Sequence, residues 1–176
     1  MQAGVIVFPG SNCDRDVAIC LEAAFGQKPK MIWHGDSELP PLDVIVIPGG
    51  FSYGDYLRCG AMAAHSKIMQ EVIKAAKKGV LLLGICNGFQ ILIECGLLPG
   101  ILMRNQNMHF ICKDAKLMVE NSTTPFTHSY KQGQHISLPI AHNEGNYFAD
   151  DETLKELEGD GQIVFRYQKD ENPNGS

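Results

Sequence analysis

Long runs of lysine and arginine are missing from this 176-residue sequence, which carries 15 basic side chains against 20 acidic ones. The net charge of −5 is spread along the chain, so no segment offers the positive track that a phosphate backbone requires. Apolar stretches are also short, because glycine or proline interrupts each one before the roughly 18 residues of a membrane span. The first residues lack the basic segment and cleavage site of a secretory signal. We therefore expect no nucleic-acid partner, no membrane contact and a cytoplasmic location.

Cysteines at metal-binding spacing are missing as well. Six cysteines occur, but none forms a C-x-x-C pair or lies at zinc-finger spacing from a histidine. With 44% hydrophobic residues the chain can build a full core, so it does not need disulfide bonds for stability. We expect no metal site and no cofactor in this chain, and a packing role for every cysteine except Cys86.

Short apolar runs that end at glycine or proline predict buried parallel strands. Three such runs and a fourth candidate cover residues 3–8, 43–47, 79–85 and 30–34. Apolar side chains at helical spacing occupy the connecting segments, residues 17–25, 61–75 and 89–95. Ser11 or Asn12 is the candidate N-cap of the first helix, and Gly79 and Gly96 end the other two. This alternation predicts an α/β fold, a doubly wound, flavodoxin-like and mostly parallel sheet with helices on both faces.

After Pro99 the pattern changes to shorter strands separated by polar turns. The expected strands, partly antiparallel, cover residues 110–112, 116–120, 134–141 and 162–167, and a short helix is expected over residues 151–157. The sequence shows no internal repeat and no low-complexity segment. We therefore expect one domain spanning residues 1–176.

The segment Gly84-Ile85-Cys86-Asn87-Gly88 follows a predicted strand and precedes a predicted helix. This is the context of a nucleophile elbow, where glycines two residues to either side of the nucleophile avoid a steric clash. The thiol then lies at a helix N-terminus, where the free N–H groups favour the thiolate. The N–H of Asn87 is placed to donate to an oxyanion. The alternative is a buried cysteine in a tight turn.

A second glycine-rich segment, Pro48-Gly49-Gly50-Phe51, ends the preceding strand. In isolation it predicts only a glycine turn. Ligands of doubly wound sheets bind at the carboxyl ends of strands, and the loops at residues 9–13, 48–53 and 86–90 emerge there. Next to the Cys86 elbow, Gly50 therefore becomes the candidate second oxyanion donor.

These motifs resemble those of class I (triad-type) glutamine amidotransferases, in GICNGFQ (residues 84–90) and PGGF (residues 48–51). FPGSNCDRD, PGGFSYGDYLR and IAHNEG, which begin at Phe8, Pro48 and Ile140, are more distinctive. They resemble the small glutaminase subunits of phosphoribosylformylglycinamidine synthase, and this similarity runs along the whole chain.

The resemblance implies hydrolysis of L-glutamine to glutamate and ammonia through a thioester on Cys86. A large synthetase subunit that binds ATP and magnesium would receive the ammonia for purine biosynthesis, and a small bridging subunit is a further candidate partner. Carried over by position, the oxyanion donors are Gly50 and Asn87. The substrate-binding residues are Gly49, Phe51, Gln90, His142 and Gly145. Near the mouth facing the partner, the resemblance places Tyr53, Tyr56 and Arg58.

One part of the family pattern is missing. The catalytic histidine and glutamate of the family lie in a His-Pro-Glu segment near the C-terminus, and this sequence contains no such tripeptide. His142 and Glu144 have the same spacing but match a different family segment, so we expect them to serve the substrate loop or the structure. We expect that a C-terminal portion is missing and that the 176-residue chain is poorly active.

Three alternatives remain open. The first is a DJ-1/PfpI-type cysteine hydrolase, which usually has a histidine soon after the elbow, whereas the first histidine after Cys86 is His109. The second is a flavodoxin-like module that binds phosphate at residues 10–12, although Asp14 and Asp16 would repel it. The third is a catalytically incomplete interaction subunit that has lost its base.

Overall fold

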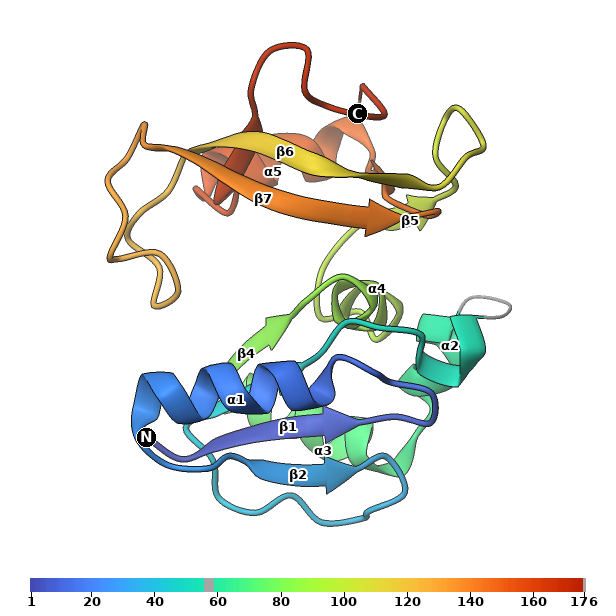
Figure 1. Cartoon of the computed structure of the whole chain (residues 1–176), viewed down its shortest axis with the longest axis vertical. Coiled ribbons are helices and arrows are strands. Elements are labelled where there is room, and N and C mark those ends of the chain that lie inside the picture. The colour runs from blue at the N-terminus through green and yellow to red at the C-terminus, as the bar shows by residue number, and fades with distance from the viewer. Residues whose placement is uncertain (56–58, 176) are drawn as a thin grey trace. The chain divides into compact units, whose positions relative to one another are not determined.

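The structure is a computed structural model that describes residues 1–55 and 59–175 (Figure 1). The chain divides into two compact units, Met1–Leu98 and Pro99–Ser176. Within the described residues no helix is both long and apolar enough to cross a lipid bilayer.

The first unit is built on a four-stranded parallel sheet. The strands are β1 (Ala3–Val7), β2 (Lys30–Trp33), β3 (Val44–Ile47) and β4 (Leu81–Gly84), in the order β2-β1-β3-β4. Each neighbouring pair is parallel, and Val5 of β1 lies opposite both Met31 and Val46. The strand order reverses between β1 and β3, which places the switch point of a doubly wound sheet at their carboxyl ends. The predicted fold class is confirmed.

Two apolar clusters, one on each face, hold helices against this sheet. One joins Ile6, Ile45 and Ile47 to side chains of α3 (Lys67–Lys77) and α4 (Asn87–Glu94). The other joins Ala3, Val44 and Val46 to Val17, Leu21 and Phe25 of α1 (Asp14–Phe25), which runs along β1 in Figure 1. Successive side chains of a strand point to opposite faces of the sheet. Because one cluster covers each face, every residue of β3 is buried.

Two helix predictions for this unit are wrong in detail. The stripe over residues 61–75 forms two helices, α2 (Cys59–Ala64) and α3, because Ser66 has extended backbone (ψ 151°) and is the N-cap of α3. Its N–H donates to the carbonyl oxygen of Ala63 at 2.9 Å, which closes α2. The N-cap of α1 is Cys13 instead of Ser11 or Asn12, and no side chain caps that helix.

The second unit is antiparallel. Its central strand β6 (Ile111–Val119) pairs with β7 (His135–His142) and with β9 (Phe165–Tyr167), while β5 (Ile101–Met103) pairs with β8 (Asn146–Phe148). The helix α5 (Asp151–Gly159) begins after Asp150, whose carboxylate accepts the N–H of Thr153 at 2.8 Å.

The sequence predicted two short strands where β6 is continuous. Lys113, Asp114 and Ala115 lie between the two predicted strands, and they continue the ladder opposite Ile140, Pro139 and Leu138, respectively. The three-residue strands β5 and β8 were not predicted, and β9 is shorter than the predicted residues 162–167.

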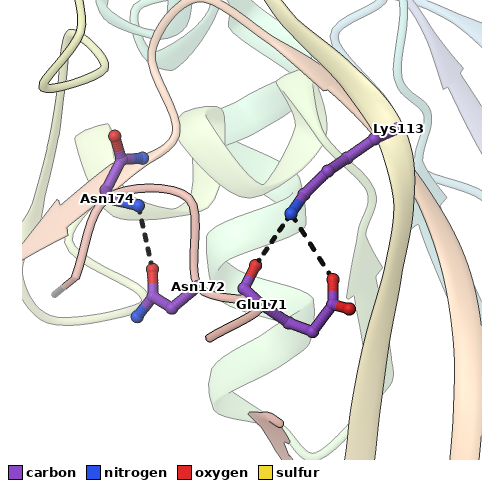
Figure 2. A network of polar contacts seen from close by, with 4 residues as sticks. All are labelled: Lys113, Glu171, Asn172 and Asn174. Atoms are coloured by element: carbon purple, nitrogen blue, oxygen red, sulfur yellow. Dashed lines mark hydrogen bonds and ion pairs between the residues drawn. The ribbon is translucent and has the colours of Figure 1, made fainter. Parts of the chain in front are cut away.

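A turn close to the end of the chain is attached to β6 (Figure 2). The Lys113 ammonium donates to the backbone oxygen of Glu171 at 3.2 Å and lies 3.4 Å from its carboxylate. The backbone N–H of Asn174 donates to Oδ1 of Asn172 at 3.0 Å, which closes the turn. The Asn174 side chain is hydrogen-bonded to Asn105 and Gln106 of the same unit.

Candidate active site

Cys86 lies at the tip of a sharp turn between β4 and α4. Its backbone has φ 51° and ψ −107°, a conformation that non-glycine residues rarely adopt. Such strain costs on the order of 1–3 kcal/mol and persists where the surrounding structure enforces it. The Cys86 side chain is exposed, and the residue is the N-cap of α4, whose first N–H groups favour a negative charge there. This is the backbone of a nucleophile elbow with an accessible sulfur.

Cys95, at the other end of α4, shows the contrast with a packing cysteine. Burial, reinforced by the charge of Glu94, raises the pKa of the Cys95 thiol to about 11. At neutral pH this thiol stays protonated and has little reactivity. Cys95 packs against the core cluster next to the sheet, which is the role predicted for it.

The two glycines that flank Cys86 are required by close contacts. A β-carbon on Gly84 would lie 2.6 Å from Cδ1 of Leu92 and 2.8 Å from the carbonyl oxygen of Gly88. A β-carbon on Gly88 would fall on the carbonyl oxygen of Ile47, which is backbone and cannot rotate away. The steric reason inferred from the sequence motif therefore holds in the structure.

Hydrogen bonds fix the first turn of α4 after the nucleophile. The N–H of Gly88 donates to Ile85 at 2.8 Å, and the N–H of Gln90 donates to the Cys86 carbonyl at 3.2 Å. The buried side chain of Asn87 donates from Nδ2 to Oε1 of Gln90 at 2.8 Å. Asn87 was predicted only as a backbone donor, and the structure adds that its side chain orients Gln90.

Gly49 and Gly50 bring backbone to the nucleophile. A β-carbon on Gly49 would lie 3.3 Å from Cβ of Cys86, so a side chain at this position would crowd the nucleophile. Gly50 has φ 112°, and a β-carbon there would overlap Oδ1 of Asn12. Within residues 1–55 and 59–175 the N–H of Gly50 has no acceptor, which leaves it available to a ligand. Phe51 follows and is 52% exposed.

The loop at residues 9–13 holds the Gly50 segment in place. A β-carbon on Gly10 would lie 2.7 Å from the carbonyl oxygen of Phe51, and Tyr53 donates its N–H to the carbonyl oxygen of Pro9. Tyr53 also has positive φ (55°), and its hydroxyl lies 3.0 Å from Nδ1 of His34. The three loops predicted at the carboxyl ends of the strands are thus in contact. Tyr56 and Arg58 lie outside the described residues.

The two site residues predicted in the second unit, His142 and Gly145, lie together around Asn105. Nδ1 of His142 is 2.9 Å from Oδ1 of Asn105, and the N–H of Gly145 donates to the same oxygen at 3.2 Å. Asn105 is fully buried. It was not predicted, because nothing in a polar segment such as MRNQNMH marks a side chain whose partner is 37 residues away.

No group of three or more histidine, cysteine, aspartate or glutamate side chains among the described residues could hold a metal ion. The first unit presents the exposed thiol of Cys86 beside the backbone N–H groups of the glycine-rich strand end. An exposed cysteine at a helix N-terminus, with a glycine-rich strand end against it, suits nucleophilic attack on a carbonyl carbon and stabilisation of the resulting oxyanion.

A family comparison agrees with this geometry. The model of the CobB/CobQ-like glutamine amidotransferase domain matches residues 1–176. The chain belongs to this family. The amidotransferase is 58% identical over 176 residues to "Phosphoribosylformylglycinamidine synthase subunit PurQ" of Nostoc sp., covering all of this chain and 78% of the relative. The protein of the same name from Rhizobium johnstonii is 57% identical, with coverage of 100% and 79%.

Among solved structures, the amidotransferase matches a chain of "PurLQS from Thermotoga maritima" with a TM-score of 0.86 and 49% sequence identity. The match covers 99% of this chain and 77% of that one. Agreement at this level extends over both compact units, so the antiparallel second unit is part of the similarity as well as the parallel sheet.

Proposed function

We propose that this chain is the glutaminase subunit of phosphoribosylformylglycinamidine synthase, an enzyme of purine biosynthesis. It hydrolyses L-glutamine to glutamate and ammonia, and a large synthetase subunit uses the ammonia. Relatives of that name at 57–58% identity over the whole chain support the assignment, as does the similarity to a chain of PurLQS. The structural observation that carries the chemistry is the exposed Cys86 at a positive-φ elbow, where the missing side chain of Gly49 leaves space beside it.

The thiolate of Cys86 attacks the side-chain amide carbon of glutamine, and the C=O electrons move to the oxygen. The N–H groups of Gly50 and Asn87 donate to this oxyanion. When the carbonyl reforms, the C–N bond breaks, the nitrogen takes a proton from water and leaves as ammonia, and a thioester remains on Cys86. Water then attacks the thioester, which releases glutamate and restores the thiol.

The other proposed site residues bind and orient glutamine. Gly49 leaves room for the substrate beside the sulfur, and Phe51 offers an exposed apolar surface. Gln90, oriented by Asn87, contacts the polar groups of the substrate. We also propose a glutamine-binding role for His142 and Gly145 of the second unit. Proton donation to the leaving ammonia is assigned to no residue here, because the chain contains no His-Pro-Glu segment.

ATP and magnesium belong to the large subunit in this proposal, and a small bridging subunit is a further partner. A cytoplasmic location also remains a prediction. The alternative of a catalytically incomplete interaction subunit differs from the proposal in one respect: such a subunit would not turn over glutamine at Cys86. The family match removes the support for a DJ-1/PfpI-type hydrolase.

Thioester formation and turnover are tested separately. A glutamine-analogue affinity label should modify Cys86 and spare the exposed Cys20 and Cys112. In the complex with the large subunit, Cys86→Ala should abolish glutamine-dependent synthesis and leave ammonia-dependent synthesis intact. Labelling spread over all exposed cysteines, or loss of both activities in the variant, would contradict the proposal. Labelling without turnover would support an interaction subunit that lacks its base.

A further inference from the structure

The amide group of Asn105 has only one orientation that satisfies its neighbours. Its nitrogen lies 2.8 Å from the carbonyl oxygen of His109 and 2.8 Å from that of His142. Both partners are acceptors, so the atom between them must be the NH₂ group, which has two hydrogens to donate. The opposite atom of the amide is therefore the oxygen Oδ1.

Oδ1 of Asn105 receives the remaining contacts. The N–H of Gly145 donates to it at 3.2 Å, and the side-chain amide of Asn174 donates at 3.3 Å. Nδ1 of His142 lies nearest, at 2.9 Å. Because a carbonyl oxygen has no hydrogen to donate, the hydrogen of this contact must be on Nδ1.

Three further features favour a neutral imidazole in this position. A β-carbon on Gly145 would overlap the His142 ring, so glycine is needed for the ring to lie there. Oδ1 of Asn174 accepts the N–H of Gln106 at 2.9 Å, which ties the loop next to Asn105 to the turn shown in Figure 2. Burial also lowers the pKa of His142, because the charged imidazolium is poorly solvated there.

We propose that Asn105 is a positioning residue that holds His142 as the neutral Nδ1–H tautomer, so that Nε2 accepts a hydrogen bond from an N–H group of the substrate. Among the residues that the structure describes, Nε2 of His142 has no hydrogen-bond partner. The choice of an N–H donor rests on the proposed function, since glutamine carries such groups on its amide and its ammonium. The tautomer itself does not depend on that function.

The tautomer can be measured directly. In the chain labelled with ¹⁵N-histidine, long-range ¹H–¹⁵N correlation spectra at a pH where His142 is neutral distinguish a protonated Nδ1 from a protonated Nε2. His142→Asn identifies the His142 signals by their loss. The expected result is a hydrogen on Nδ1. A hydrogen on Nε2, or an equal mixture of tautomers, would overturn the proposal whatever the chain catalyses.

Two substitutions of His142 separate anchoring from substrate contact. His142→Asn keeps a donor near the place of Nδ1 and removes the acceptor at Nε2, while His142→Gln places an amide oxygen near Nε2 and loses the anchor to Asn105. In the complex, His142→Asn should raise the KM for glutamine by about 10-fold or more, the effect of one lost hydrogen bond, while the thermal midpoint stays close to wild type. An unchanged KM in a folded variant would overturn the acceptor role.

Asn105→Ser and Asn107→Ala provide a matched pair. Asn107 lies in the same loop, and among the residues with a described structure its exposed side chain accepts only the N–H of His109. Asn105→Ser should release the Nε2–H tautomer, whereas Asn107→Ala should keep the wild-type spectrum. If both variants keep it, Asn105 does not set the tautomer.

Titration with glutamine and with glutamate, which lacks the amide N–H, then shows which N–H group perturbs the His142 signals. If the affinity label fails to modify Cys86, the proposed function fails while the tautomer result stands.

Discussion

The α-carbon of Gly88 lies so close to the carbonyl oxygen of Ile47 that a β-carbon on Gly88 would overlap that oxygen. The same oxygen accepts the N–H of Ile85 at 3.0 Å, one residue before the nucleophile. The end of β3 therefore supports the elbow at two points, the N–H of Ile85 and the α-carbon of Gly88. The sharpness of the turn at Cys86 depends on this contact as well as on the local sequence.

Gly88→Ala should destabilise the chain and damage the elbow. The new methyl group can be accommodated only if α4 or the end of β3 moves, and overpacking of this kind costs about 1–3 kcal/mol. Urea unfolding measures the loss, and reactivity of Cys86 with the glutamine-analogue label should fall in parallel. The control is Gly159→Ala near the end of α5, where a β-carbon meets nothing within 4 Å and φ is not positive. This variant should be neutral or more stable by up to about 1 kcal/mol.

Gly50→Ala should lower glutaminase turnover. The methyl group would overlap Oδ1 of Asn12, and φ of 112° is unfavourable for alanine, so the N–H of Gly50 must shift. Loss of one oxyanion donor typically lowers kcat by about 10²–10³-fold. Gly26→Ala controls for the backbone effect alone, because φ is 70° and the surrounding space is open. Its turnover should equal wild type although its stability falls, and a similar loss of turnover in both variants would contradict the role of Gly50.

Acidification should destabilise the chain through His142. Burial lowers the pKa of folded His142 below 6.5, the ordinary value of a histidine in an unfolded chain. The unfolded state therefore takes up this proton first as the pH falls, so stability that is present above pH 6.5 is lost below it. The free energy of unfolding should decrease more steeply between about pH 7.5 and pH 5.5 in the wild type than in His142→Asn, which does not titrate. Equal slopes would mean that burial does not affect this imidazole.

Cys86 and Cys95 should differ in alkylation. With the pKa of Cys95 raised to about 11 by burial, iodoacetamide at pH 8 should modify Cys86 and leave Cys95 intact until the chain is unfolded. Mass spectrometry of the peptides that contain each cysteine measures the two rates. Rapid modification of Cys95 in the folded chain would show that this end of α4 opens readily.

The parallel half of the fold could be predicted because its signals are local. Apolar runs marked the four strands, and the glycines around Cys86 marked the elbow, because each reflects a steric demand within a few residues. The break at His65 and Ser66 was missed since the apolar stripe continues across it, and these two residues alone separate α2 from α3.

The missed parts of the site depend on residues that are distant in sequence. Asn12 could be quoted as part of a motif, but its contact with Gly50 follows from the packing of two loops on neighbouring strands. Asn105 reaches His142 and Asn174 across 37 and 69 residues. Side-chain hydrogen bonds of this kind have no period and no fixed spacing, so a single sequence cannot reveal them.

The φ of 51° at Cys86 belongs to the main chain, and every L-amino acid placed there inherits its cost, serine and alanine included. Glycine alone escapes it. A library of variants sorted only for resistance to heat would therefore enrich Cys86→Gly, a folded chain without a nucleophile. Selection for stability therefore favours glycine at position 86, whereas selection for glutamine cleavage requires cysteine.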